Sequence, residues 1–186
     1  MNLPRRAVFL DRDGVLNRKA PEGSYIATLD QFELLPGALE AVAEFGRAGY
    51  LVIVVTNQRG VARGLVTLAD LECIHDRLRA RTLEAGGQID HIYICPHDYS
   101  DNCECRKPHP GMILQAARDY CLELADSWVI GDSASDIEAG QRAGCRTICV
   151  GTNCSAKAHY TVAALEEAVG LVLAGREMSD WQASSR

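Results

Sequence analysis

The sequence predicts an α/β fold with three layers, in which a parallel sheet is covered by helices on both faces. Short apolar runs alternate along the chain with amphipathic stretches, as in folds built from strand–helix–strand units. The runs are apolar on both faces, which is typical of strands inside a covered sheet. The chain has 186 residues, a length that one hydrophobic core can fill. We therefore expect one domain over residues 1–176, with no room for a cap domain, and a polar tail over 177–186.

The individual elements follow from this alternation and from proline and glycine positions. The expected strands are residues 7–10, 51–56, 91–95, 127–130 and 147–150. The expected helices begin after proline or end at glycine, and they span residues 37–48, 68–85, 111–120, 135–143 and 162–174. Ligands of open parallel sheets bind beyond the carboxyl ends of the strands. The residues that directly follow each strand are therefore the first candidates for chemistry.

Composition and charge exclude several classes of function. The hydrophobic fraction of 47% and the charged fraction of 24% are those of a soluble globular protein. The longest apolar run, residues 50–55, is about a third of the length that spans a membrane. The net charge of −6 argues against a nucleic-acid partner. The first residues lack the apolar segment of a secretory signal, so we expect a cytoplasmic protein with no membrane partner.

Carboxylates follow the first and fourth expected strands. Asp11 and Asp13 lie on an extended backbone that points both side chains the same way, and Gly14 lets the chain turn directly afterwards. Like charges this close need a cation between them, and Mg²⁺ is the natural candidate; the alternative is a solvated acidic turn. Asp132 and Asp136 add carboxylates at the same sheet edge, although Asp136 alone fits a charge that stabilises a helix N-terminus.

Two further loops carry groups suited to phosphate. Thr56 and Asn57 place a hydroxyl and free backbone N–H groups after the second strand, where they can hold phosphate oxygens, although such residues are also common in turns. Arg106 and Lys107 precede the third long helix. An arginine there can clamp a phosphoryl group and a lysine can supply a point charge, or both are simply solvated.

Four possible metal ligands follow the third strand, within a loop over residues 95–105. They are Cys95, His97, Cys103 and Cys105. Three thiolates and one imidazole complete a tetrahedral zinc shell, whereas the alternative is a polar loop with buried thiols. A closed shell has no open coordination position, so we expect a structural zinc that braces the loop carrying Arg106 and Lys107.

The chain has eight cysteines in all. Because no export signal is present, disulfides are the weaker interpretation. We interpret most of the remaining thiols as small buried apolar groups; they are Cys73, Cys121, Cys145, Cys149 and Cys154.

The order of these loops resembles the motifs of the haloacid dehalogenase (HAD) superfamily of phosphohydrolases, over roughly residues 5–175. Residues 11–14 look like its first motif, Thr56 its second, Lys107 its third and residues 132–136 its fourth. The resemblance implies a Rossmann-like, HAD-like sheet and an aspartyl-phosphate mechanism. In that mechanism Asp11 is the nucleophile, Asp13 is the general acid and base, and Thr56 and Lys107 stabilise the phosphoryl group. Mg²⁺ would be held by Asp11, the Asp13 backbone carbonyl and Asp132, with Asp136 orienting this shell.

The zinc loop, residues 105–112 and residues 56–64 narrow the resemblance to a capless branch, the D-glycero-D-manno-heptose-1,7-bisphosphate 7-phosphatases. Members remove the 7-phosphate during synthesis of nucleotide-activated heptose for the lipopolysaccharide core. The resemblance implies a sugar bisphosphate as the partner, with Arg106 on its second phosphate. The remaining substrate-binding candidates are Gly23, Ser24, Tyr25, Asn57, Gln58 and Arg59.

Three points stay open beside this resemblance. The chain has Arg59 and Ser133 where members of the branch carry Ser and Lys. Histidinol-phosphate phosphatase domains share the first motif, the zinc ligands and the Arg-Lys-Pro run, and they are the alternative. A zinc-stabilised binding module without catalysis is a third hypothesis, which the intact aspartates argue against. With no cap and no obvious exposed apolar stripe, we expect a monomer.

Overall fold

A six-stranded parallel sheet forms the centre of the protein in the computed structural model, which describes residues 5–152, 154 and 157–184, with side chains described as far as residue 175. The strands are β1 (Ala7–Leu10), β2 (Leu51–Asn57), β3 (His91–Cys95), β4 (Trp128–Gly131), β5 (Arg146–Val150) and β6 (Tyr160–Val162). Their order across the sheet is β3-β2-β1-β4-β5-β6. In the register, Leu10 lies beside Val54 on one neighbouring strand and beside Ile130 on the other. The loops after β1, β2 and β4 therefore begin at the same sheet edge, with β2 continuing three residues beyond Val54, to Asn57.

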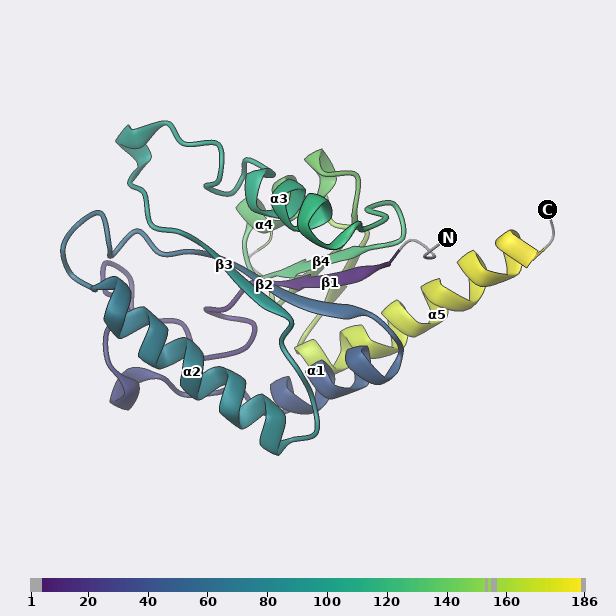
Figure 1. The fold of residues 1–186 in the computed structure, drawn as a ribbon, viewed down its shortest axis with the longest axis horizontal. Helices are drawn as coiled ribbons and strands as arrows, with labels where there is room; N and C mark the ends of the chain where they lie inside the picture. Colours follow the sequence, from purple (N-terminus) through teal and green to yellow (C-terminus); the bar gives the residue numbers. More distant parts are fainter. Residues whose placement is uncertain (1–4, 153, 155–156, 185–186) are drawn as a thin grey trace.

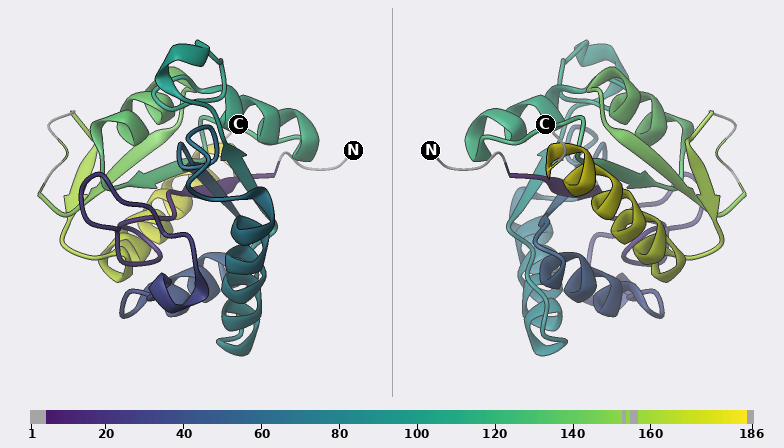
Figure 2. Two further views of the ribbon diagram at one scale, coloured as in Figure 1. Left: turned by 90° about the vertical axis from the view of Figure 1, so that its left-hand side faces the viewer. Right: turned by 90° about the vertical axis from the view of Figure 1, so that its right-hand side faces the viewer.

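Helices cover both faces of this sheet, as Figure 1 shows. On one face lie α1 (Ala38–Arg47), α2 (Leu68–Glu84) and α5 (Leu165–Ser184); on the other lie α3 (Gly111–Tyr120) and α4 (Ala134–Arg142). Two short 3-10 helices, η1 (Leu29–Gln31) and η2 (Tyr99–Asp101), lie in the loops after β1 and β3. The views of Figure 2 show the same three layers from the two ends of the molecule. The predicted three-layer α/β fold is confirmed.

Two apolar clusters fill the space between the layers. Phe45 and Trp128 belong to the cluster under α1 and α5, while Phe9 and Ile113 belong to the cluster under α3 and α4. All four residues of β1 are buried, because the strand is covered on both faces. Among the described residues, no helix combines the length and the hydropathy that crossing a bilayer requires.

The sequence prediction was wrong at the C-terminal end of the fold. Strand β6 was missed because it is only three residues long and two of them are exposed. Val162, the expected start of the last helix, ends this strand, and α5 begins at Leu165. The helix also continues beyond its expected end, through much of the expected polar tail, to Ser184. Gly175 does not terminate it; a side chain there would meet the ring of Trp128 at 2.7 Å, so this glycine permits close packing instead.

The interpretation of the five remaining cysteines needs correction. Cys149 and Cys154 form a disulfide, with Cα atoms 6.0 Å apart. Cys73, in α2, and Cys121, which follows the last residue of α3, are exposed free thiols. Cys145 is a buried free thiol, as expected, and burial raises its pKa to about 12.

Candidate functional site

A pocket of about 580 Å³ opens at the carboxyl ends of the central strands. Strand β1 leads into it from the middle of the sheet, β2 and β4 from either side, and the loop after β1 forms one wall. Every candidate outside the zinc loop lines this pocket: Asp11, Asp13, Gly23, Ser24, Tyr25, Thr56, Asn57, Gln58, Arg59, Arg106, Lys107, Asp132 and Asp136. The fold thus gathers residues from four separate loops, as expected for an open parallel sheet.

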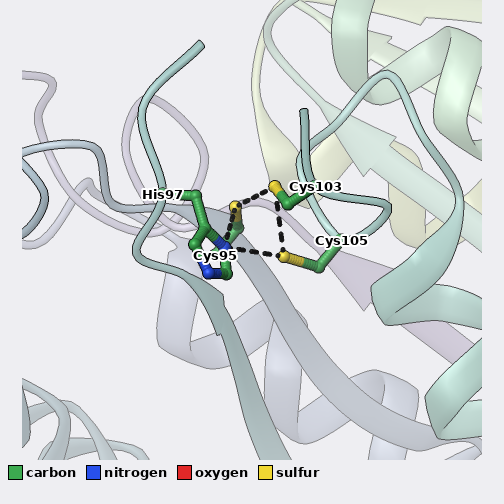
Figure 3. Close-up of side chains that lie close together, drawn as sticks. All are labelled: Cys95, His97, Cys103 and Cys105. Atoms are coloured by element: carbon green, nitrogen blue, oxygen red, sulfur yellow. Dashed lines mark hydrogen bonds between the residues drawn. The ribbon is translucent and has the colours of Figure 1, made fainter. Parts of the chain in front are cut away.

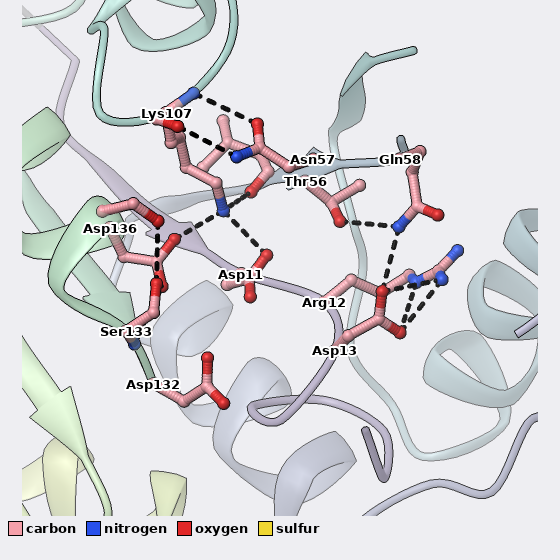
Figure 4. A network of polar contacts seen from close by, with 12 residues as sticks. Asp11, Arg12, Asp13, Thr56, Asn57, Gln58, Lys107, Asp132, Ser133 and Asp136 are labelled. Carbon is pink, nitrogen blue, oxygen red and sulfur yellow. Dashed lines mark hydrogen bonds and ion pairs between the residues drawn. The ribbon is translucent and has the colours of Figure 1, made fainter. Parts of the chain in front are cut away.

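Lys107 and Asp11 form a buried pair at the base of the pocket (Figure 4). The Nζ atom of Lys107 lies 2.8 Å from Asp11 Oδ1 and 2.6 Å from Asp136 Oδ1, and it donates to the Val55 carbonyl at 2.7 Å. Burial raises the pKa of Asp11 to about 7, although the nearby Lys107 charge opposes that rise. Burial disfavours the charge of Lys107, but Asp11 and Asp136 outweigh it and raise the pKa of the amine. A permanent cation therefore lies beside a buried carboxylate.

The second carboxylate of the first motif, Asp13, is fixed by three side chains. Arg12 Nη2 lies 2.9 Å from Asp13 Oδ2, and Gln58 Nε2 donates to the same oxygen at 3.0 Å. Asn17 Nδ2 donates to Asp13 Oδ1 at 2.9 Å. Burial by itself would raise the pKa of Asp13, but the Arg12 charge and these hydrogen bonds outweigh it and lower the pKa. Gln58 also donates to Thr56 at 2.8 Å. Because Gln58 follows β2 and Asp13 follows β1, the hydrogen bond between Gln58 and Asp13 links the loops after these two strands.

The acidic cluster fits a Mg²⁺ ion. Carboxylate oxygens of Asp11, Asp132 and Asp136 lie within 4.8 Å of one another. Asp132 Oδ1 is buried and has no hydrogen-bond partner within the described part of the chain, which is costly for an anion unless a cation binds there. Gly14, with a φ of 96°, has no Cβ and so leaves room for the Asp132 carboxylate. The other oxygen, Asp132 Oδ2, pairs with Lys19 Nζ at 2.8 Å.

Asp136 is bound by its neighbours on both oxygens. One pairs with Lys107, as described, and the other accepts the backbone N–H of Ser133 at 3.1 Å at the start of α4. These partners leave Asp136 suited to holding Lys107 and the helix start rather than to binding a metal directly.

Asn57 joins the end of β2 to the loop that carries Lys107. Its Nδ2 donates to the Lys107 carbonyl at 3.1 Å, and its Oδ1 accepts the Lys107 N–H, also at 3.1 Å. The side-chain amide of Asn57 is thus engaged by backbone. Asn57 therefore holds the loop that carries Lys107 against the sheet edge, and Asn57 itself lines the pocket.

The four predicted zinc ligands converge in the loop after β3 (Figure 3). Cys95 Sγ lies 3.5 Å from Cys103 Sγ, and Cys103 Sγ lies 3.5 Å from Cys105 Sγ. His97 Nδ1 lies 3.6 Å from the Cys95 sulfur and 3.2 Å from the Cys105 sulfur. Ligands arranged tetrahedrally about 2.3 Å from one ion would lie about 3.8 Å apart, so the cluster fits zinc with little adjustment.

The zinc loop forms one side of the pocket mouth. The ring of Tyr99, in η2, contacts two guanidinium groups, with its centroid 4.4 Å from Arg59 and 4.3 Å from Arg106. Arg59 Nε lies 2.6 Å from Asp98 Oδ1, and Arg106 Nη1 donates to the His97 carbonyl at 3.2 Å. Two cations are therefore held at the mouth by the segment that carries the metal ligands.

The pocket lining includes three cationic or aromatic residues that were not among the sequence candidates. Lys19, Tyr99 and Arg63 all line the pocket, and Arg63 Nη1 lies 3.4 Å from the Tyr25 hydroxyl. Single lysine, tyrosine or arginine residues in loops carry no spacing pattern. Arg63 lies within residues 56–64, which supported the resemblance, so its segment was noticed although its side chain was not.

Comparisons with known proteins identify the family of the chain. Residues 104–169 match the HAD-hydrolase-like family model. The chain is 44% identical to the D-glycero-beta-D-manno-heptose-1,7-bisphosphate 7-phosphatase of Pseudomonas putida, over 79% of this chain and 83% of that protein. It is 38% identical to the Escherichia coli protein of the same name, over 76% of both chains.

A solved structure supports the same relationship. The D,D-heptose 1,7-bisphosphate phosphatase of B. bronchiseptica, complexed with magnesium and phosphate, superposes with a TM-score of 0.85. Its sequence is 35% identical, and the match covers 90% of this chain and 98% of that one. With this identity over nearly the whole fold, and with the carboxylates, Lys107 and the cysteine cluster in one place, the chain belongs to the heptose-1,7-bisphosphate 7-phosphatase family of HAD-like hydrolases.

Proposed function

We propose that the protein is a Mg²⁺-dependent phosphoric monoester hydrolase that removes the 7-phosphate of D-glycero-D-manno-heptose 1,7-bisphosphate. This reaction serves the synthesis of nucleotide-activated heptose for the lipopolysaccharide core. The observation that carries the proposal is that cations line one pocket at two depths, with the Lys107 side chain 3% exposed and the Arg59 side chain 31% exposed. Lys107 lies beside Asp11 at the base, and Arg59 and Arg106 lie at the mouth. A substrate with two phosphates suits this separation, and the names of the relatives support it.

The carboxylates divide the reaction into two proton-balanced steps. Asp11 attacks phosphorus and forms an aspartyl-phosphate while the bond to the sugar oxygen breaks. Asp13 gives its proton to that leaving oxygen. In the second step Asp13 takes a proton from the water that attacks the aspartyl-phosphate, which releases phosphate and restores Asp11. Lys107 and Thr56 hold the phosphoryl oxygens in both steps.

Asp11, Asp132 and the Asp13 backbone carbonyl are the residues that would hold Mg²⁺. The ion, when bound, neutralises the repulsion between the carboxylate and the phosphate. Asp136 keeps the ammonium of Lys107 directed at Asp11 through its 2.6 Å ion pair. Zinc in the cysteine cluster would have a structural role, because Cys95, His97, Cys103 and Cys105 would close its coordination shell.

The second phosphate is assigned to the pocket mouth. The guanidinium groups of Arg106 and Arg59 both lie against the ring of Tyr99. The segment with Gly23, Ser24 and Tyr25 also lines the pocket, and we assign it to the sugar between the two phosphates. We assign Asn57 and Gln58 to positioning Lys107 and Asp13 around the substrate.

A phosphate-release panel tests the proposal. The panel contains both anomers of the heptose 1,7-bisphosphate, histidinol phosphate and fructose 1,6-bisphosphate, each with added Mg²⁺. We expect the highest kcat/KM for a heptose bisphosphate, and the relatives' names favour the beta anomer. Arg106→Ala should raise KM for the bisphosphate more than for a heptose 7-phosphate that lacks the second phosphate. A higher kcat/KM for histidinol phosphate would contradict the assignment.

We further propose that the enzyme works as a cytoplasmic monomer without a macromolecular partner. The net charge of −6 disfavours nucleic acid as a partner. Light scattering during gel filtration tests the oligomeric state. A dimer mass would contradict the monomer.

A further inference from the structure

The arginine of the first motif, Arg12, is completely buried beneath the pocket. Its Nε and Nη2 atoms donate to Asp13 at distances between 2.9 and 3.1 Å. Its Nη1 atom points the other way and lies 3.2 Å from Nε2 of His75. A buried guanidinium is costly unless its N–H groups find acceptors, so both contacts matter for its position.

The contact with His75 fixes the protonation state of the imidazole. A guanidinium has only donors, so Nε2 of His75 must accept and the ring must carry its proton on Nδ1. His75 is buried, and burial together with the Arg12 charge lowers its pKa to about 4. The ring is therefore a neutral acceptor at neutral pH.

His75 belongs to α2, whose other buried residues are mostly apolar. Its neighbours Leu71, Ile74 and Leu78 are buried along the same helix. Among the described residues that line the pocket, none belongs to α2, and Arg12 is also absent from the lining. His75 and Arg12 thus lie behind Asp13, where they cannot touch a substrate.

We propose that His75 is a positioning residue that acts through Arg12 to hold the Asp13 carboxylate in line with the leaving oxygen and the attacking water. The inference rests on the proposed function, because Asp13 must transfer the proton in both steps. Without an acceptor at position 75, the guanidinium has no partner on its Nη1 side and can turn away from Asp13. Asp13 would then keep only the neutral amides of Asn17 and Gln58. Proton transfer would suffer while substrate binding would not.

Three variants test this. His75→Leu removes the acceptor, His75→Gln supplies a side-chain oxygen in its place, and Ile74→Val loosens the same helix without touching Arg12. We expect kcat of the Leu variant to fall by about tenfold to a hundredfold, within the contribution of general acid–base catalysis. KM should stay within about twofold, because neither residue contacts substrate. The Gln variant should recover most of the loss, and Ile74→Val should retain the wild-type kcat.

A second substrate separates the two chemical steps. p-Nitrophenolate leaves without needing a proton, so the Leu variant should still form the aspartyl-phosphate from p-nitrophenyl phosphate. Its second step needs Asp13, so a burst of about one p-nitrophenolate per site should precede slow turnover. This readout also works if the heptose bisphosphate proves not to be the substrate, which keeps failure of the proposed function distinct from failure of this inference.

Several results would overturn the inference. They are equal losses in the Leu and Gln variants, an unchanged kcat in the Leu variant, or an effect confined to KM. Should His75→Leu fail to fold, ¹⁵N NMR of the wild-type ring provides an independent test. We expect an unprotonated Nε2 and a protonated Nδ1 at pH 7. An imidazolium, or a proton on Nε2, would contradict the assignment.

Discussion

The ammonium of Lys107 pairs with both Asp11 and Asp136. Removing the charge of Asp11 therefore leaves Lys107 with one ion-pair partner. In Asp11→Asn, Lys107 keeps Asp136 and the Val55 carbonyl as partners. The amide cannot act as the nucleophile. We therefore expect turnover to be abolished while the thermal midpoint stays within a few degrees of wild type. Phosphate release and circular dichroism check this, and substantial residual phosphatase activity would contradict the role of Asp11.

His75 predicts a pH dependence of stability. Its pKa is about 4 in the folded protein against an ordinary value of 6.5, so the unfolded chain binds the extra proton between these values. The penalty is absent above about pH 6.5 and complete below about pH 4, where it amounts to about 3 kcal/mol. We expect the unfolding free energy of wild type, relative to His75→Gln, to fall by this amount from pH 7 to pH 4. Urea titrations measure it, and a pH-independent difference would be the contrary result.

Lys19 predicts an effect on the divalent ion. Its ammonium lies 2.8 Å from Asp132 Oδ2, so it competes for the charge that would hold Mg²⁺. Lys19→Met should tighten Mg²⁺ binding by roughly two- to fivefold, the scale of an exposed ion pair. Isothermal titration calorimetry with MgCl₂ measures this. Arg18→Met is the matched control, since Arg18 pairs with Glu33 at 2.9 Å instead. Unchanged or weaker Mg²⁺ affinity in Lys19→Met would refute the competition.

The sequence was sufficient to identify candidate residues that directly follow strands. It did not reveal the side chains from distant segments that contact them. Asp11, Asp13 and Asp132 were found because a buried strand precedes each of them. The contact of Arg12 with His75 spans 63 residues and that of Lys19 with Asp132 spans 113. No local pattern encodes such pairs, because they depend on how α2 and the loop after β1 pack against the sheet.

At the scale of elements, the loop over residues 95–105 would link the proposed zinc site to the proposed substrate contact of Arg106. Arg106 follows Cys105 and donates to the carbonyl of His97, and both of these residues belong to the predicted zinc shell. Removing zinc should therefore both unfold the loop and release Arg106. We expect a chelator to lower Tm by about 10 °C and to raise KM for the bisphosphate.

Elemental analysis and one substitution complete this test. Cys103→Ser should reproduce the effect of the chelator, because it removes one thiolate from the shell. Cys73→Ser, at an exposed cysteine outside the cluster, is the matched control and should leave Tm unchanged. Absence of zinc from the purified protein, together with an unchanged Cys103→Ser variant, would contradict a structural zinc.

Strands and helices with strong apolar patterns were predicted to within a residue or so, and weak ones were not. β1, β3 and α3 have their expected bounds. β6 was not predicted because it is three residues long and two of them are exposed, so its sequence is too short to show a recognisable alternation of apolar and polar residues. The predicted end of α5 was wrong because Gly175 was interpreted as a helix terminator. Its missing side chain instead allows Trp128 to pack closely against the helix. Position within the tertiary structure overrides local propensity in both cases.

For the whole molecule, the two apolar clusters share one sheet and should unfold together. Phe45 is buried on one side of the sheet and Phe9 on the other. We expect Phe45→Ala and Phe9→Ala each to cost about 3–5 kcal/mol and to lower the same single calorimetric transition. Two separate transitions, each responding to one variant, would show instead that the layers unfold independently.

The strand order places the candidate site where the sequence predicted it. β1 lies between β2 and β4, so the chain leaves β1 at the point where successive connections run to opposite halves of the sheet. This is the crevice in which open α/β sheets bind ligands. The global arrangement was therefore predictable from strand-end residues, while the mouth of the pocket, where Tyr99 contacts two arginines, was not.

The direction of the strands also separates the pocket from both ends of the described chain. Arg5 lies just before β1, at the edge opposite the pocket. α5 begins near the pocket side and runs back past the strand starts, where Gly175 accepts a hydrogen bond from Arg146 at the start of β5 (Figure 1). A solid support or a fused protein attached at either end would sit behind the catalytic mouth. The enzyme can thus be immobilised from both directions with its substrate entrance still facing free solution.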